Sequence, residues 1–220
     1  MPMTDFIQTL HGSTKRDYIA RVNRFDKAHC AEVAKQYGYD YWDGERQYGY
    51  GGYRYDGRWG GVAQNMIQHY GLKQDAKILD IGCGKGYLLY EFTQLLPHCH
   101  VTGLDISQYA IDNAKPEVKS RLRQGTASEL PFEDAAFDLI ISNGALHNLK
   151  IYELIKAIKE IERVRADKSW ICVESYRNER ERVNLLYWQL TCESFYSVDE
   201  WQWLYKENGY HGDYEFIFFE

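Results

Sequence analysis

Residues 78–86 read Ile-Leu-Asp-Ile-Gly-Cys-Gly-Lys-Gly, and this stretch decides the fold. An apolar run typical of a buried strand passes through three alternating glycines, Gly82, Gly84 and Gly86, into an apolar pattern with helical spacing. Glycine has no Cβ and tolerates positive φ, so the main chain of this turn can touch a ligand at the carboxyl end of the strand. The stretch therefore predicts a parallel sheet whose first strand ends at a small-molecule site.

Short apolar runs alternate with helical patterns after residue 76, which is typical of a sheet built from βα units. Strands are expected at residues 77–81, 101–105, 122–124, 137–142, 170–174 and 214–219. We predict an α/β fold with a doubly wound, mostly parallel, six- to seven-stranded Rossmann-like sheet and an N-terminal helical and loop cap. Residues 1–60 would form this cap, including a loop rich in tyrosine and glycine from residue 37 to 59, and residues 61–220 one compact cofactor-binding unit.

The spacing of the glycines and the preceding acidic residue distinguish between possible nucleotide cofactors. In the dinucleotide fingerprint the third glycine comes three positions after the second, where this chain has Tyr87. Asp80 stands two positions before the first glycine. A carboxylate there attracts a cofactor with positive groups and repels a pyrophosphate, which disfavours NAD and FAD.

The segment from Asp80 to Gly86 resembles the first motif of class I S-adenosylmethionine-dependent methyltransferases, and the resemblance extends over about residues 60–175. It implies S-adenosyl-L-methionine as the cofactor, with Asp105 after the second strand holding the ribose hydroxyls. Residues 125–132 resemble the family's adenine-side segment, although Thr126 stands where many members have aspartate. The expected cofactor-binding residues are Asp80, Gly82, Cys83, Gly84, Gly86, Asp105, Ile106, Thr126, Ala127 and Asn143.

A methyl acceptor that is a hydroxyl or an ammonium group has to lose a proton. His147 shortly follows the fourth expected strand and is the predicted catalytic base, with orientation of the next loop as the alternative. Glu174 and Tyr176, at the end of the fifth strand, are further candidates for substrate contact. Asn143 is not followed by the two prolines and aromatic residue of many nucleobase and amide N-methyltransferases, which disfavours those acceptors.

Residues 48–59 combine tyrosine, glycine and arginine at a density found nowhere else in the chain. We expect this segment to close over the site, with Tyr48, Tyr50, Tyr53 and Arg58 contacting the substrate. Their aromatic and guanidinium groups suit ring stacking, cation–π contact or a clamp on a carboxylate. A purely structural loop or a dimer surface is the alternative.

Composition excludes several classes of protein. The net charge of −6 would repel a nucleic-acid backbone, and no apolar run or leader predicts a membrane segment, so we expect a cytoplasmic protein. Five scattered cysteines indicate neither a disulfide framework nor a zinc site. The sequence His98-Cys99-His100 lacks a further ligand nearby, so no metal site is predicted.

Together these features predict a methyltransferase that acts on an O or N atom of a small polar metabolite, such as a sugar, a nucleotide sugar or an amino-acid-like compound. The expected assembly is a monomer or a homodimer. A protein or peptide methyltransferase, a non-catalytic S-adenosylmethionine-binding protein and a nicotinamide oxidoreductase are the alternatives. The family's sheet normally ends in an antiparallel pair, and the sequence leaves open whether the final strand is present.

Overall fold

The computed structural model describes residues 3–7, 10 and 18–220. Its strands are β1 (Lys77–Ile81), β2 (His100–Asp105), β3 (Leu122–Gln124), β4 (Phe137–Asn143), β5 (Arg165–Glu174) and β6 (Asp213–Ile217). The longer helices are α5 (Trp59–Tyr70), α6 (Tyr87–Leu95), α9 (Ile151–Val164), α10 (Glu179–Trp188) and α11 (Val198–Glu207). The shorter ones are α2 (Tyr18–Arg24), α3 (Lys27–Ala34), α4 (Tyr39–Trp42), α7 (Gln108–Asp112), α8 (Pro116–Lys119) and the 3₁₀ turn η1 (Leu146–Asn148).

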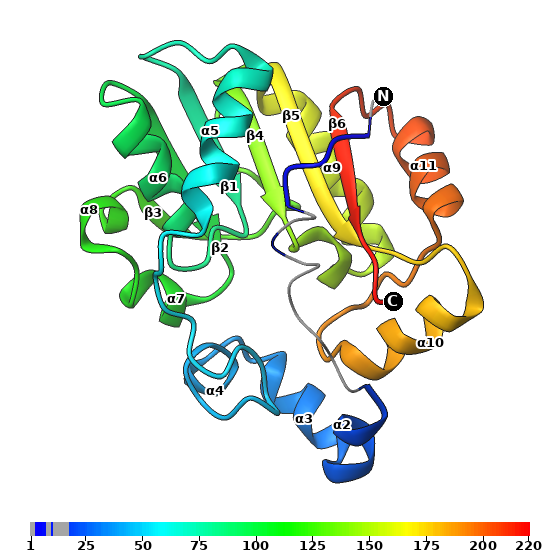
Figure 1. The fold of residues 1–220 in the computed structure, drawn as a ribbon. Helices are drawn as coiled ribbons and strands as arrows, with labels where there is room; N and C mark the ends of the chain where they lie inside the picture. The colour runs from blue at the N-terminus through cyan, green and yellow to red at the C-terminus, as the bar shows by residue number, and fades with distance from the viewer. Residues whose placement is uncertain (1–2, 8–9, 11–17) are drawn as a thin grey trace.

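The six strands form one sheet in the order β3-β2-β1-β4-β5-β6, and every described pair is parallel. This arrangement confirms the predicted doubly wound Rossmann-like fold. The order reverses direction between β1 and β4, and at such a switch point the loops that leave the strands diverge and open a crevice. The cap helices α2 to α4 lie beyond the carboxyl ends of the strands (Figure 1).

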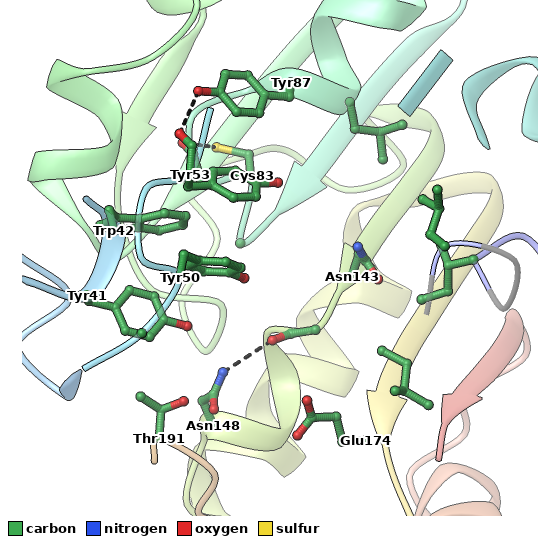
Figure 2. A pocket seen from close by; sticks show the side chains of 18 of the residues that line it. Tyr41, Trp42, Tyr50, Tyr53, Cys83, Tyr87, Asn143, Asn148, Glu174 and Thr191 are labelled. Atoms are coloured by element: carbon green, nitrogen blue, oxygen red, sulfur yellow. Dashed lines mark hydrogen bonds between the residues drawn. The ribbon is translucent and has the colours of Figure 1, made fainter. Parts of the chain in front are cut away.

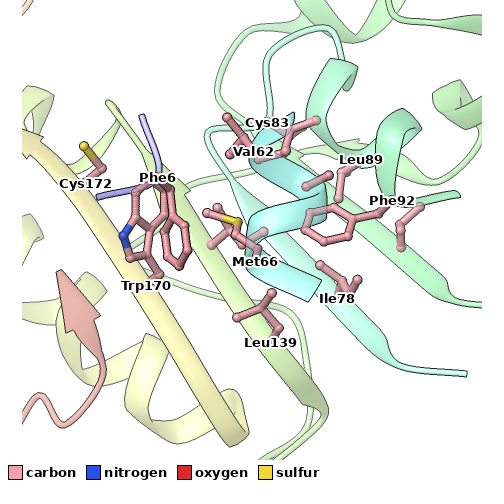
Figure 3. Close-up of a cluster of buried hydrophobic side chains, with 14 of the residues drawn as sticks. Phe6, Val62, Met66, Ile78, Cys83, Leu89, Phe92, Leu139, Trp170 and Cys172 are labelled. Carbon is pink, nitrogen blue, oxygen red and sulfur yellow. The ribbon is translucent and has the colours of Figure 1, made fainter. Parts of the chain in front are cut away.

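The core has two layers because alternate residues of each strand face opposite sides of the sheet. Ile78, Leu139 and Trp170 face one side, where they pack with Met66 of α5 and Phe92 of α6 (Figure 3). The residues next to them in the strands, Leu79, Ile140 and Ile171, pack on the other side with α9 and α11. Strands buried on both faces explain the continuous apolar runs of the sequence.

The largest differences from the sequence predictions are at β5 and within residues 37–59, whereas the ends of the other strands differ by at most two residues. β5 begins at Arg165, directly after α9, five residues before the predicted start. The polar residues of this extension are still paired with β4, Arg165 with Phe137 and Lys168 with Leu139, so backbone pairing rather than apolar burial makes them a strand. The predicted loop at residues 37–59 contains the helical turn α4, whose Trp42 is buried.

Residues near the N-terminus, between Met3 and Ile7, lie against the last strand. Met3 forms a parallel bridge with Tyr214, and the Thr4 amide donates to the Tyr214 carbonyl at 3.0 Å. The buried carboxylate of Glu215 accepts hydrogen bonds from the Phe6 and Ile7 amides at 2.8 and 3.0 Å. The edge of β6 is thereby covered by a segment distant in sequence, and no antiparallel strand is present among the described residues.

We predict that Glu215→Ala lowers the free energy of unfolding by about 1–3 kcal/mol, because two buried amides lose their acceptor. Denaturant unfolding measures this loss, and hydrogen exchange should quicken at the Phe6 and Ile7 amides. The exposed Glu207→Ala serves as the control and should change stability by less than about 0.5 kcal/mol. Unchanged exchange at both amides in Glu215→Ala would contradict this assignment.

Candidate functional site

A cavity of about 440 Å³ lies where the carboxyl ends of β1, β4 and β5 meet the cap. Its volume is in the range of small-molecule sites. The glycine loop after β1 and the start of the β4–η1 segment form one wall, and the aromatic residues of the cap form another (Figure 2). Side chains from β5 and from the segment after α10 complete it, including Glu174, Gln189 and Thr191.

The glycines of the loop are required both for its backbone conformation and for the space that a Cβ atom would fill. Gly82, Gly84 and Gly86 have φ values of 80°, 54° and 73°, a region that other residues rarely adopt. A Cβ on Gly84 would also lie 2.8 Å from the ring of Trp42, and one on Gly82 would collide with Ala145. The missing Cβ atoms therefore allow Trp42 and Ala145 to pack directly against the main chain of this loop.

Two carboxylates, Asp80 and Asp105, are buried at the ends of β1 and β2. Asp105 accepts from the Gly84 amide at 2.7 Å and the Ser107 amide at 2.8 Å. Burial raises the pKa of Asp105, and these two amides oppose the rise. Burial, and then the charge of Asp105, raise the pKa of Asp80 to about 7.

Asp80 shows that the cavity fits the predicted cofactor. Its side chain is 4% exposed and lines the cavity, and its Oδ1 atom has no hydrogen-bond partner among the described residues. A buried carboxylate oxygen without a donor is costly unless a ligand supplies one. The ammonium of a methionine moiety lying against Gly82–Gly84 would do so, whereas a pyrophosphate would be repelled.

The cap is fastened to the glycine loop by a buried ion pair. Lys85 Nζ lies 2.7 Å from both carboxylate oxygens of Asp43 and donates to the Tyr53 carbonyl at 2.9 Å. Burial alone would raise the pKa of Asp43, but hydrogen bonds from Lys85 and Tyr109 lower it below its usual value. The lysine of the glycine loop thus serves the cap and not the cavity.

Trp42 adds a second contact between the cap and the cofactor loops. Its indole N–H donates to Ser107 Oγ at 2.9 Å, and its ring lies over Gly84. The ring also stacks on Tyr50 with centroids 5.2 Å apart. Asp105 lies behind this contact, 6% exposed.

The structure brings together most of the residues predicted for the site. Nine of them line the cavity: Asp80, Gly82, Cys83, Gly84, Asn143, His147, Tyr50, Tyr53 and Arg58. The six others do not: Gly86, Asp105, Ile106, Thr126, Ala127 and Tyr48. Gly86 instead caps α6, and Tyr48 packs in a small apolar cluster around Cys30 and Leu190. Arg58 is exposed and paired with Asp56.

His147 is 2% exposed at the floor of the cavity, and both of its ring nitrogens face Glu174. Its Nδ1 accepts from the Glu174 amide at 3.3 Å, which places the proton on Nε2, 3.6 Å from the Glu174 carboxylate. Burial lowers the pKa of His147 to about 3, so the ring is neutral at physiological pH. The Glu174 carboxylate also accepts from Gln189 Nε2.

Sequence reasoning missed several lining residues. Tyr41 and Trp42 belong to a segment that was expected to be only a loop, and their aromatic character was the available signal. Trp188 is the last residue of α10, and Gln189 and Thr191 follow it; no motif singles out this part of the sequence. Glu174 lines the cavity as considered, whereas the Tyr176 hydroxyl lies 3.5 Å from Glu200 Oε2, outside it.

Other groups carry no sign of a second site in the described part of the chain. All five cysteines are free and buried, and no group of three potential metal ligands comes together there. None of the described helices has the length and apolarity needed to cross a membrane.

The fold and the site define a Rossmann-like protein that holds a nucleoside cofactor at the carboxyl ends of β1 and β4, as methyltransferases do. The methyltransferase domain family matches residues 72–209, more than half of the chain. The chain belongs to this family of class I S-adenosylmethionine-dependent methyltransferases, which confirms the predicted family and its cofactor. The assignment leaves the nicotinamide oxidoreductase alternative without support.

Similar proteins carry the same domain. The methyltransferase YcgJ of Bacillus subtilis is 30% identical over 65% of this chain and 60% of its own length, and its crystal structure superposes with a TM-score of 0.55 over 66% of each chain. A demethylmenaquinone methyltransferase of Staphylococcus aureus is 28% identical over 64% of each protein. A structure of an S-adenosylmethionine-dependent methyltransferase of Methanosarcina mazei, 24% identical, covers 65% of this chain and 82% of its own at a TM-score of 0.52. The matches span less than two thirds of these curated relatives' length.

We predict that Asp43→Ala loosens the cap. The Lys85 side chain is 5% exposed and would be left without its counter-charge. The free energy of unfolding should therefore fall by up to about 3 kcal/mol. This is the low end of the range for a buried pair, because the Asp43 side chain is 24% exposed. Limited proteolysis should then cut within residues 37–59 faster. Asp56→Ala removes the exposed partner of Arg58 and should cost less than about 1 kcal/mol; equal effects of the two variants would refute the anchor.

A second prediction concerns Asp80. Because its folded pKa is about 7, the carboxyl is mostly protonated at pH 6, and a bound ammonium should lower that pKa and expel about one proton. Calorimetry of S-adenosylmethionine binding in buffers of different ionisation enthalpy counts this proton. When it binds S-adenosylmethionine at pH 6, Asp80→Asn should release about one proton fewer than the wild-type protein.

The same shift affects the ligand-free protein. The folded state keeps a proton that the unfolded state releases above about pH 4, so the contribution of Asp80 to stability falls as pH rises towards 7. Asp80→Asn should remove this slope from the stability profile. A wild-type profile with the opposite slope, unchanged by the substitution, would contradict a raised pKa.

Proposed function

We propose that this protein transfers the methyl group of S-adenosylmethionine to an O or N atom of a small polar molecule. The unpartnered Oδ1 of Asp80 in the cavity wall beside the glycine loop carries this proposal, because it fits a ligand with an ammonium at that point. The bound cofactor would supply a methyl carbon already activated by its sulfonium. The protein then has to hold, align and desolvate the acceptor.

The positions of the predicted residues indicate which part of the cofactor each would hold. The Gly82–Gly84 main chain and Asp80 would hold its methionine part, and Asn143 lies beside them in the cavity wall (Figure 2). Asp105 would hold the ribose, and the loops with Ile106, Thr126 and Ala127 would flank the base. Asp105 lies behind Trp42, so this proposal requires α4 to move away from Gly84 when the cofactor enters.

A small acceptor suits the cavity better than a protein substrate. The cap covers the cavity with Tyr50 and Tyr53, and the volume of about 440 Å³ has to serve both the acceptor and part of the cofactor. One relative is named for a quinone-type substrate, demethylmenaquinone. The buried carboxylates and amides here favour a more polar acceptor. We keep a monomer or a homodimer as the proposed assembly, without a nucleic-acid partner.

The proton-accepting role predicted for His147 stays a prediction. Its place at the cavity floor agrees with it, but Nε2 already carries the proton when Nδ1 accepts from the backbone. In this tautomer the side chain that can accept a proton is its neighbour Glu174.

The test of the proposed function is cofactor binding followed by product identification. Calorimetry should detect S-adenosylmethionine binding, and Asp105→Ala should weaken it by about 10- to 100-fold, the effect of losing hydrogen bonds to a charged group. Asp167→Ala, an exposed carboxylate far from the cavity, should leave the affinity unchanged. Incubation with methyl-labelled cofactor and a metabolite extract should yield S-adenosylhomocysteine and a labelled product.

Two results would count against the proposal. Absence of cofactor binding by the wild-type protein would overturn it outright. Tight binding without any labelled product would favour a non-catalytic S-adenosylmethionine-binding protein, and label in protein instead of small molecules would favour a protein methyltransferase.

A further inference from the structure

Three arginines of the cap line the cavity, namely Arg46, Arg54 and Arg58. Two of them are engaged by neighbouring groups. Arg46 donates to the Gly49 carbonyl, and its Cζ lies over the Trp188 ring, 5.2 Å from the centroid. Arg58 Nε donates to both carboxylate oxygens of Asp56, at 2.9 and 2.8 Å.

Arg54 differs from the other two arginines. Its side chain forms no hydrogen bond, ion pair or ring contact with the residues that the structure describes. The side chain is exposed and folds back on the cavity wall, because Arg54 Nε lies 4.0 Å from the place that a Cβ of Gly52 would take. A guanidinium is permanently charged and has five N–H donors, so Arg54 offers the cavity a cation that a ligand can pair with.

The backbone of Arg54 is held beside the glycine loop. The carbonyl of Tyr53, in the peptide bond that leads to Arg54, accepts hydrogen bonds from Lys85 Nζ and the Tyr87 hydroxyl, both at 2.9 Å. Lys85 belongs to the glycine loop, and Tyr87 is the first residue of α6. Burial first, and then neighbouring groups that include Asp80, raise the pKa of Tyr53, so this part of the cap lies near that carboxylate.

An amino-acid group that lies against Asp80 brings a negative charge of its own. In the proposed function the ammonium of the methionine part meets Asp80, and the carboxylate on the same carbon then lies close to that residue as well. Two carboxylates repel each other in a buried site unless a cation balances them. Of the three arginines in the lining, Arg54 is the one that no described group engages. Its fork of N–H donors matches the two oxygens of a carboxylate.

We propose that Arg54 is the carboxylate-binding residue of the cavity. This inference rests on the proposed function. The methionine part of the cofactor is the source of the carboxylate nearest to Asp80, and a carboxylate on the methyl acceptor is the other source of the same chemistry. With the cofactor as the source, Asp80 and Arg54 recognise the two opposite charges of one amino-acid group.

The placement of the two residues has a consequence for the cap. Asp80 belongs to β1, whereas Arg54 belongs to the cap. A ligand that carries both charges therefore joins the sheet to the cap, in addition to the ion pair between Lys85 and Asp43. The ligand's carboxylate then holds the cap closed over the cavity.

The test compares S-adenosylmethionine with decarboxylated S-adenosylmethionine, which lacks only the carboxylate. Calorimetry on the wild-type protein should show at least about tenfold tighter binding of S-adenosylmethionine, the effect of hydrogen bonds between charged groups. Arg54→Gln should reduce this preference to less than about threefold. Arg180→Gln, which changes an exposed arginine of α10 outside the cavity lining, should keep it. Unchanged affinity of Arg54→Gln for the decarboxylated compound shows that the variant is folded.

A second measurement distinguishes the two sources of the carboxylate. NMR titration follows the binding of ¹³C-labelled acetate to the complex with S-adenosylhomocysteine. If the cofactor's carboxylate occupies Arg54, acetate should bind equally weakly to the complexes of wild type and Arg54→Gln. If the acceptor supplies the carboxylate, both cofactor forms should bind alike, and acetate should bind more tightly to the wild-type complex.

Limited proteolysis within residues 37–59 reports on the cap. In wild type, saturating S-adenosylmethionine should slow the cutting more than the saturating decarboxylated compound does, and in Arg54→Gln the two should protect equally. Equal protection in wild type would contradict the cofactor as the source of the carboxylate.

Failure of this inference and failure of the proposed function give different results. If wild type binds neither form of the cofactor, both are overturned together. If it binds them, but neither the cofactor preference nor acetate binding depends on Arg54, this inference alone is overturned. Loss of the preference in Arg58→Gln while Arg54→Gln keeps it would likewise overturn the assignment to Arg54.

Discussion

The parallel sheet buries the carboxylates of Asp80 and Asp105 near the carboxyl ends of adjacent strands, and burial, with the charge of Asp105 second, makes Asp80 difficult to ionise. Asp80 pairs in register with Gly103, two residues before Asp105. Asp105 is stabilised by the amides of Gly84 and Ser107, which belong to the loops that follow the two strands. Asp80 receives no such donor on Oδ1, so its charge has to be balanced by a proton or by a ligand. A cationic cofactor would balance the charge of Asp80 in the folded protein.

The cap depends on the same loop. Lys85 is the one cation between Gly84 and Gly86, and it could have neutralised the nearby carboxylates. It is paired instead with Asp43 and donates to the Tyr53 carbonyl, which fastens the aromatic segment to the glycine loop. This ion pair therefore holds the cap against the glycine loop. Trp42 extends this contact over Gly84, where a side chain other than hydrogen would prevent it.

The sheet and the glycine-loop half of the site could be predicted from the sequence, because both depend on local sequence features. Residues 78–86 carry local information, since burial on both faces requires an apolar run and close ligand approach requires glycine. The contribution of Trp42 could not be predicted, because it depends on a helical turn meeting a loop 42 residues away in sequence. The same holds for Gln189 and Thr191, which reach the cavity only through the packing of α10. Arg58 was predicted as a clamp from its chemistry, but its neighbour Asp56 already occupies its guanidinium.

The last strand shows how the sheet is completed without an antiparallel partner. β6 pairs with β5 in parallel, and the edge it leaves is met by Met3 and Thr4 from the other end of the chain. The Glu215 carboxylate accepts hydrogen bonds from the Phe6 and Ile7 amides, and Ile7 and Leu10 form part of the cavity lining. Residues that cover an exposed edge and residues that shape the cavity are thus adjacent in one short segment. An uncovered edge strand would be able to pair with other chains, so the segment that protects the sheet also supplies apolar residues to the cavity lining.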